Sequence, residues 1–363
     1  MTDAPFRYRV EHAIEQLRQA GHAASTVVPD HPGLPDALPS CDVLVLHRLE
    51  WSPRVEVIIE AARRHGVATV FDCDELVFFD GAHPHFYFLG DLSEREQQLY
   101  VEMTRNLERT ARACGVVLAS TPAIADKAAA MGLKTLLHRN VLSAFQERQG
   151  LWLGLARRLI PKAPLLGYFS GSHTHDRDLR SIGEPLTTVF ERIPEAQLLI
   201  VGHMRCPSFA ARFPGRVWVA PYLPWREVPA MMARCRALLA PLAELSPFTD
   251  AKSALKFFEP GILGVPVVAS PTAEMKAAIG DGENGWLAQS PDEWVERLTV
   301  ALSAHATRRT GARARDTVRA GYTTQAQRGV LAKTLAGLIA GAPARSHGAA
   351  ELPGHSGKTI ERP

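Results

Sequence analysis

Short apolar runs alternate with helical patterns along most of the chain, and this alternation limits the folds that the chain can adopt. The runs are rich in Val, Ile and Leu, and amphipathic stretches long enough for a helix separate them. The first series comprises "TVVP", "DVLVLHR", "VATVFD", "GVVLAST" and "KTLLHRN", and the second comprises "LLGYFS", "AQLLIVGH", "RVWVAP", "ALLAPL" and "VPVVAS". Such strand–helix–strand units form parallel sheets covered by helices on both faces. We therefore predict an α/β fold with two parallel sheets.

The boundary between the two series is expected near "LIPKAP", residues 159–164. An N-terminal domain over 1–160 and a C-terminal domain over 161–322 are predicted, each long enough for its own core. A closing helix over 323–341 is expected to cross back to the first domain, and 342–363 to be a disordered tail. The helical pattern that opens the chain has no strand pattern before it. Either the first residue of the protein is misassigned, or the first sheet lacks one strand.

Net charge and cysteine usage narrow the class of protein. The chain carries 41 basic and 38 acidic residues without long runs, a net charge of +3. The sequence therefore shows no concentration of positive charge of the kind that binds nucleic acid. Five cysteines without a Cys-x-x-Cys pair suggest neither disulfides nor a zinc site, so a reducing cytoplasm is the expected setting. No signal peptide or run of about 18 apolar residues is seen. Peripheral contact with the inner face of the membrane remains open.

Three charges interrupt the otherwise apolar segment "DAKSALKFFEPGILGVPVVAS", residues 250–270. The segment predicts a helix over 252–263, capped by Asp250, that leads into a buried strand. The charged side chains fall within an arc of about 60° on this helix: Lys252, Lys256 and Glu259. A solvated face would explain such a stripe. A cation in the first turn nevertheless opposes the helix dipole unless an anion joins it, and a phosphate would fit there.

The order of several motifs resembles the C-terminal domain of retaining, GT-B-type nucleotide-sugar glycosyltransferases. The motifs lie between residues 165 and 300 and are "GYFSGSHTHDRDL", "LLIVGH", "ALLAPL", "KSALKFFEPGILGVPVVAS" and "ENGWLA". The N-terminal half resembles the partner domain of a bacterial subgroup more loosely, through "PFRYRVEHAIEQLRQAG", "DVLVLHR", "VFDCDELVF" and "STPAIADKAAAMG". The resemblance implies the GT-B fold, in which two Rossmann-like domains face a cleft. It also implies a nucleotide-sugar donor in the second domain, an acceptor in the first, and no essential metal or other cofactor.

The resemblance assigns roles to the charged stripe. Glu259 occupies the position of a glutamate that binds the ribose hydroxyls, and a carboxylate can accept hydrogen bonds from both. Lys252 and Lys256 would stabilise the diphosphate as it leaves. The family's other glutamate is replaced by Ala251. Asp250 beside it either reaches the sugar hydroxyls or only caps the helix.

Two strand ends in the second half add donor-binding candidates, because α/β sheets bind ligands outside the carboxyl ends of their strands. The candidates are Ser170 and Gly171, whose amides can approach phosphate, Arg177, which adds charge, and His203 after the next strand. A metal site is the alternative use of this loop, and an ordinary capped turn explains the same residues: His173, His175 and Asp176.

In the first half, charged residues follow two predicted strands. The acceptor-side candidates are His47, Arg48, Asp72, Glu75 and, near the start of the chain, Arg7 with Arg9. Asp74 is the candidate base for the acceptor hydroxyl. Asp72 and Asp74 also have the spacing of a metal-binding Asp-x-Asp, which we rank below acceptor binding. His138 and Asn140 either line the cleft or cap a loop.

The predicted reaction is transfer of a sugar to an acceptor hydroxyl with retention of anomeric configuration, in bacterial glycan or glycoconjugate synthesis. A glycan, a lipid-linked or a small-molecule acceptor fits equally well. Two alternatives remain open: a nucleotide-sugar epimerase on the same architecture and a non-catalytic nucleotide-sugar-binding module. A nicotinamide dehydrogenase is disfavoured, because no Gly-x-Gly-x-x-Gly follows a first strand.

Overall fold

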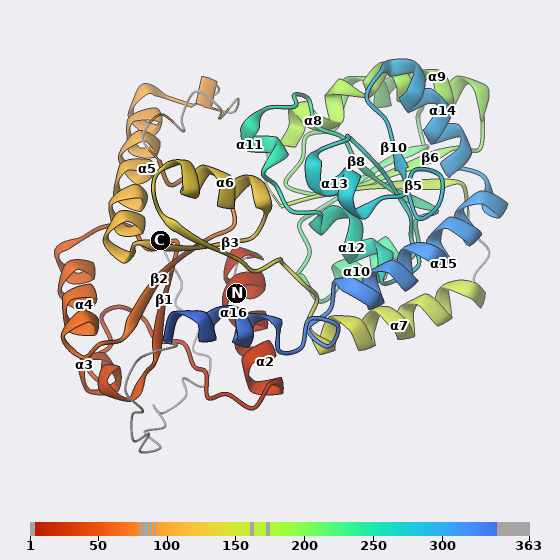
Figure 1. Cartoon of the computed structure of the whole chain (residues 1–363). Helices are drawn as coiled ribbons and strands as arrows, with labels where there is room; N and C mark the ends of the chain where they lie inside the picture. The colour runs from red at the N-terminus through yellow and green to blue at the C-terminus, as the bar shows by residue number, and fades with distance from the viewer. Residues whose placement is uncertain are drawn as a thin grey trace. The chain divides into compact units, whose positions relative to one another are not determined.

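A computed structural model of the chain describes residues 4–79, 81, 86, 89–90, 92–159, 163–171 and 175–339 (Figure 1). Internal contacts divide these residues into two units, one of 4–141 with 327–339 and one of 142–326. The division falls before helix α7 (Ala144–Leu159), earlier than the boundary predicted at residue 160. The reason is local packing, since Arg157 Nη1 of α7 donates to the Gly264 carbonyl at 3.0 Å. The tail predicted over 342–363 lies outside the described residues.

The first unit contains a four-stranded parallel sheet in the order β1-β2-β3-β4. The strands are β1 (Val43–His47), β2 (Ala68–Cys73), β3 (Val116–Ala119) and β4 (Lys134–Leu137). The helices are α1 (Ala4–Phe6), a π-helix (Arg7–Glu11), α2 (His12–Gln19), α3 (Leu34–Ala37), α4 (Pro53–Arg64), α5 (Glu94–Cys114), α6 (Pro122–Ala130) and α16 (Val330–Ile339). In the register, His47 pairs with Asp72, which places the polar ends of two strands together.

Helices cover both faces of this sheet. On one face Val70 and Leu118 pack against Leu331 and Leu335 of α16, together with α2. On the other face Leu46 packs against α4 and the end of α5. Helix α16 therefore completes the core of the first unit although it follows the whole second unit in the sequence (Figure 1).

One predicted strand of the first unit is wrong. The sequence predicts a strand at "TVVP", but residues 22–28 have no regular secondary structure. Val27 packs against the small cluster around Leu34, whereas Val28 is exposed. One partly buried side chain gives too little apolar contact to order a strand, and Pro29 has no N–H to donate to a ladder.

The second unit contains a six-stranded parallel sheet in the order β10-β9-β8-β5-β6-β7. The strands are β5 (Leu165–Ser170), β6 (Gln197–Gly202), β7 (Val217–Ala220), β8 (Ala237–Ala240), β9 (Val267–Ala269) and β10 (Trp286–Leu287). Helices lie on both faces (Figure 1), and they are α7, α8 (Asp176–Ser181), α9 (Gly183–Arg192), α10 (Val228–Met232), α11 (Pro247–Asp250), α12 (Leu255–Gly261), α13 (Ala273–Ala278), α14 (Pro291–Ala301) and α15 (Ala304–Gly321). The two parallel sheets confirm the predicted α/β class.

The helix predicted over 252–263 is shorter than expected. Helix α11 ends at Asp250 and α12 begins only at Leu255, with Ala254 at its N-cap position. Lys252 therefore lies in the turn between the two helices, and the prediction that it occupies the first turn of one long helix is wrong. Asp250 does not cap α12 either, because its Oδ1 accepts a hydrogen bond from the backbone N–H of Ala273 at 2.6 Å.

Candidate functional site

Lys256 is the central cation of the second unit. It lies one residue into α12, partly buried, with its Nζ 5.0 Å from the centre of the Tyr168 ring on β5. Burial lowers the pKa of Lys256 to about 8, although the charge of Asp178 opposes this effect. Lys252 lowers that pKa further and Glu259 raises it. The predicted stripe and Asp178 are therefore close enough to interact electrostatically.

Asp178 is the group in this cluster that the sequence analysis missed. Its buried carboxylate accepts from His175 Nδ1 at 2.7 Å and from the backbone N–H of Ala243 at 2.9 Å. Burial alone would raise the pKa of Asp178, but these hydrogen bonds and the charges of His175 and Lys256 hold it below its usual value. The i, i+3 spacing of His175 and Asp178 at the start of a helix was the available sequence signal.

His175 belongs to the same cluster. Burial lowers the pKa of its imidazole, and the neighbouring charges of Lys256 and Lys252 lower it further, against the hydrogen bond with Asp178. The ring is therefore neutral near pH 7. His173, its partner in the metal-site alternative, lies outside the described residues.

Lys252 and Glu259 flank Lys256. Lys252 Nζ lies 5.1 Å from the centre of the Phe248 ring, so its charge lies over an aromatic face. Glu259 is partly exposed on α12. Asp250 accepts a hydrogen bond from the backbone at the start of α13 instead of capping α12, and its proposed contact with the sugar hydroxyls stays a prediction.

The ends of β5 and β6 approach each other closely. Ser170 pairs with Gly202, whose φ of 126° belongs to the region that favours glycine. A Cβ at Gly202 would collide with the carbonyl oxygen of Ser170, so the register requires glycine there. His203 follows and stacks on the exposed ring of Tyr222, with centroids 5.0 Å apart and planes 9° apart. Gly171 and Arg177 are both exposed.

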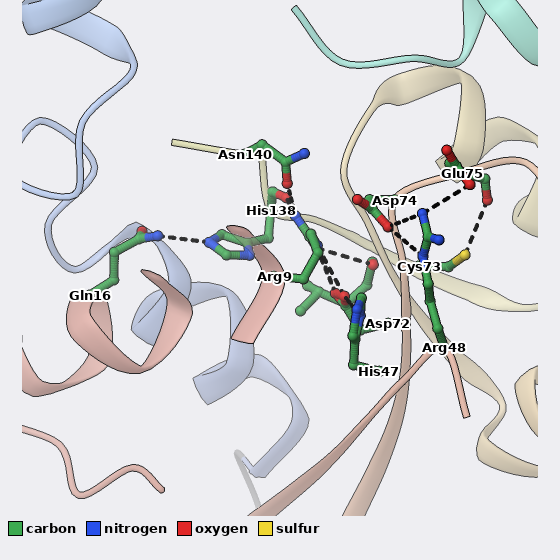
Figure 2. Close-up of polar contacts among 11 residues, drawn as sticks. Arg9, Gln16, His47, Arg48, Asp72, Cys73, Asp74, Glu75, His138 and Asn140 are labelled. Carbon is green, nitrogen blue, oxygen red and sulfur yellow. Dashed lines mark hydrogen bonds and ion pairs between the residues drawn. The ribbon is translucent and has the colours of Figure 1, made fainter. Parts of the chain in front are cut away.

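Arg9 organises the polar cluster of the first unit (Figure 2). Its guanidinium is buried and donates to both carboxylate oxygens of Asp72 at 2.6 to 3.1 Å. Nη1 also donates to Asn140 Oδ1 at 3.0 Å and to the carbonyl oxygen of His138. His47 Nδ1 lies 3.1 Å from Asp72 Oδ1. The strand ends and the N-terminal helical segment are thereby joined through one ion pair.

This environment fixes the charge of Asp72. Burial alone would raise the pKa of its carboxyl, but the charge of Arg9 and hydrogen bonds from His47 and Arg9 hold it far below its usual range. On the far side of Arg9, burial and the charge of Arg9 lower the pKa of His138 to about 3. His138 Nε2 lies 2.9 Å from Gln16 Nε2, so the neutral ring accepts from the amide.

Arg48 forms a second ion-pair cluster beside the first (Figure 2). Its Nη2 lies 2.6 Å from Asp74 Oδ1 and 3.0 Å from Glu75 Oε2. The backbone of Arg48 has a φ of 44°, and its N–H donates to the Asp72 carbonyl at 2.9 Å. Non-glycine residues seldom adopt this conformation, so the backbone is strained at the residue whose side chain contacts the two carboxylates.

Arg7 lies in the π-helix, buried, with its guanidinium 5.2 Å from the centre of the Tyr8 ring. It is Arg9, two residues later, that binds Asp72. Within the described ranges, no three His, Cys, Asp or Glu side chains are grouped so that they could hold a metal ion. The described helices include none that is both long and apolar enough to cross a membrane.

Comparisons with known proteins agree with this architecture. Residues 166–304 match the family model for Glycosyl transferases group 1. Among solved structures, a mutant of Staphylococcus aureus TarM with Fondaparinux, alpha-GlcNAc-glycerol and UDP is 10% identical, with a TM-score of 0.55 over 83% of this chain and 56% of that one. Anabaena HepE with UDP is 15% identical, with a TM-score of 0.59 over 84% of this chain and 81% of that one.

Sucrose-phosphate synthase from Thermosynechococcus elongatus is 16% identical, with a TM-score of 0.57 over 87% of this chain and 81% of that one. No curated protein matches the chain significantly. The fold is that of the GT-B glycosyltransferases, and the match to the group 1 family model is confined to residues 166–304 of the second unit. The chain spans little more than half of the TarM chain.

Proposed function

We propose that the chain transfers a sugar from a nucleotide-diphosphate donor, bound by the second unit, to an acceptor hydroxyl bound by the first unit, with retention of configuration. The observation that carries the proposal is the position of Lys256. Its ammonium has little solvent around it and lies at the end of the sheet where α/β folds bind ligands. A departing diphosphate would add a strong negative charge beside this poorly solvated cation, in addition to the charges of Asp178 and Glu259.

Lys252 and Lys256 together would stabilise the charge that develops on the diphosphate as the sugar bond breaks. In a poorly hydrated site a fixed cation interacts more strongly with the transition state than with the ground state. Glu259, on the same helix as Lys256, would accept hydrogen bonds from the ribose hydroxyls. Ser170, Gly171, Arg177 and His203 would line the remainder of the donor site.

The first unit would bind the acceptor. Asp74 and Glu75 would accept hydrogen bonds from acceptor hydroxyls while Arg48 holds them in place, and Asp74 would take the proton. Asp72, enclosed by Arg9 and His47, would act as a positioning residue rather than touch the acceptor. We propose a bacterial glycan or glycoconjugate as acceptor, in keeping with the alpha-GlcNAc-glycerol named with the TarM structure.

Turnover of a panel of nucleotide-sugars with and without acceptors tests the proposal. A thermal-shift screen finds the donor first, because a ligand at about 100 times its dissociation constant stabilises by roughly 2.7 kcal/mol. Donor consumed only with acceptor supports transfer. Donor converted without acceptor would identify an epimerase, and donor bound without turnover would identify a binding module. Comparison of the anomeric configuration of the product with that of the donor shows whether the configuration is retained.

Two variants assign the roles in the stripe. Glu259→Gln keeps the size of the side chain but weakens acceptance, so donor affinity is expected to fall by about 1 to 3 kcal/mol. Lys256→Met keeps most of the apolar stem, and turnover is expected to fall more than donor affinity. Unchanged donor affinity, turnover and melting temperature in both variants would show that the charged stripe is only a solvated helix face.

A further inference from the structure

Helix α7 exposes an apolar face to solvent. Trp152 is 76% exposed and Leu155 is 57% exposed, and Phe145 is also exposed. The spacing of these residues, with the exposed Arg148 between them, places all four side chains within an arc of about 80° on the helix. We call Phe145, Arg148, Trp152 and Leu155 the α7 patch.

The opposite face of α7 explains why the helix is firmly held. Gly150 and Gly154 let the helix approach the backbone and side chains of Ile262 and Leu263 closely. Arg157 donates from Nη1 to the Gly264 carbonyl at 3.0 Å and from Nη2 to the Cys235 carbonyl at 2.8 Å. Packing within the second unit therefore accounts for one face of α7 and for Phe145, whose ring contacts that of Trp225 edge-on with centroids 5.7 Å apart, whereas Trp152 and Leu155 are left largely exposed.

Arginine side chains lie within the patch and at its edge. Helix α15 runs antiparallel to α7, because Arg319 pairs with Glu147 near the start of α7 and Arg315 lies against Gly154 further along (Figure 1). These two arginines contact other groups of α7, and the exposed Arg148 lies within the patch itself. At the other edge, the guanidinium of Arg226 lies 5.5 Å from the centre of the Phe145 ring.

We propose that the α7 patch, with Arg148 inside it and Arg226 at its edge, docks the second unit on an anionic lipid bilayer. Tryptophan and leucine enter the interface between headgroups and acyl chains, and arginines beside them attract anionic headgroups. This charge complementarity selects the occupant, since a second copy placed symmetrically on the patch would bring two sets of arginines together. The inference does not depend on the proposed sugar transfer, because it concerns binding alone.

Flotation with vesicles tests this proposal on the full chain. Vesicles of phosphatidylcholine with about 30 mol% phosphatidylglycerol are compared with vesicles of phosphatidylcholine alone. We expect binding to the anionic vesicles only, a blue shift of tryptophan fluorescence on binding, and loss of most binding in about 0.5 M NaCl. Trp152→Ser is expected to lower the partition coefficient by about tenfold or more. Arg148→Gln is expected to lower it by about fivefold.

Trp218→Ser is the matched control, because Trp218 is 42% exposed on the edge strand β7, away from the patch. It is expected to leave the partition coefficient unchanged, and all variants should keep the wild-type melting temperature. No binding to anionic vesicles, or an equal loss in Trp218→Ser, would overturn the proposal. So would a concentration-dependent dimer that Trp152→Ser dissociates in the absence of vesicle binding, since a second copy would then cover the patch.

Discussion

Arg9 and Asp72 form a buried ion pair across 63 positions of the sequence, with Arg9 Nη2 2.6 Å from Asp72 Oδ2. Arg9 lies in the π-helix near the start of the chain, and Asp72 lies near the end of β2. The same guanidinium reaches the loop after β4 through Asn140 and the His138 carbonyl. The pair therefore attaches the N-terminal segment to the polar edge of the first sheet.

Removing one partner of this pair should destabilise the first unit strongly. Asp72→Asn leaves the buried charge of Arg9 uncompensated, and we expect a loss of about 3 to 5 kcal/mol in the free energy of unfolding. Arg9→Met should cost a similar amount. The double variant should lose less than the sum of the two single losses, and urea unfolding measures all three. Additive losses would show that the two side chains do not interact.

The same pair predicts a pH dependence of stability. The folded pKa of Asp72 lies below the unfolded value, so the unfolded state binds the proton more readily. The stabilisation is present above about pH 4, the ordinary pKa range of aspartate, and is lost as the pH falls below it. Denaturant unfolding between neutral and acid pH should show this loss in the wild type and a smaller one in Asp72→Asn. Equal acid sensitivity of the two proteins would contradict it.

A glycine pair tests the contact between strands β5 and β6. Gly202→Ala should lower the free energy of unfolding by at least about 2 kcal/mol, because its φ is positive and its Cβ would meet the Ser170 carbonyl. Gly171→Ala is the matched control, since a Cβ there meets no atom within 4 Å. Equal unfolding midpoints for the two variants would mean that the strand ends can separate at little cost.

The sequence predicted most of the fold because local patterns determine it. Nine of the described strands coincide with runs of Val, Ile, Leu and Ala bounded by polar turns, as in β6 and β8. The errors arose where partners distant in sequence decide the structure. Asp250 was predicted to cap the next helix, but its carboxylate accepts a hydrogen bond from the Ala273 N–H instead. Helix α12 begins later than predicted. At "TVVP" the neighbouring core offered too little contact.

The candidate site was likewise predicted where the signal is local and missed where the partners are distant in the sequence. The charged stripe was visible because helical spacing alone groups Lys256 with Glu259. The partnership of Asp178 with Ala243 joins residues 65 positions apart, and that of Arg9 with Asp72 joins residues 63 apart. Spacing along the chain carries no signal for such pairs. The roles assigned to the site residues remain predictions for the variants to test.

Turnover is expected to be independent of divalent metal. Asp72 and Asp74 have the spacing of a metal-binding pair, but Arg9 and Arg48 already neutralise their carboxylates. Lys252 and Lys256 would provide the positive charge that a metal ion supplies to a diphosphate in other enzymes. Activity measured after EDTA treatment should stay close to that of the untreated protein. Complete inhibition that magnesium reverses would assign a metal to the reaction.

Donor binding should take up a proton through Lys256 at alkaline pH. The free protein holds this lysine with a pKa of about 8, and a diphosphate beside it would raise that pKa because opposite charge favours the ammonium. Between the two pKa values the free lysine is neutral and the bound lysine is charged. Binding near pH 9 should therefore take up close to one proton and weaken as the pH rises further. Calorimetry in two buffers of different ionisation enthalpy measures the uptake.

Three variants separate Lys256 from the other groups in the second unit. Lys256→Met should abolish the uptake, whereas Lys276→Met, which removes an exposed lysine of α13, should leave it unchanged. Asp178→Asn removes the negative charge that raises the pKa of Lys256, so uptake should begin at lower pH while the amide oxygen can still accept from Ala243. Proton uptake that persists in Lys256→Met would place the titrating group elsewhere and remove the main support for a diphosphate at this lysine.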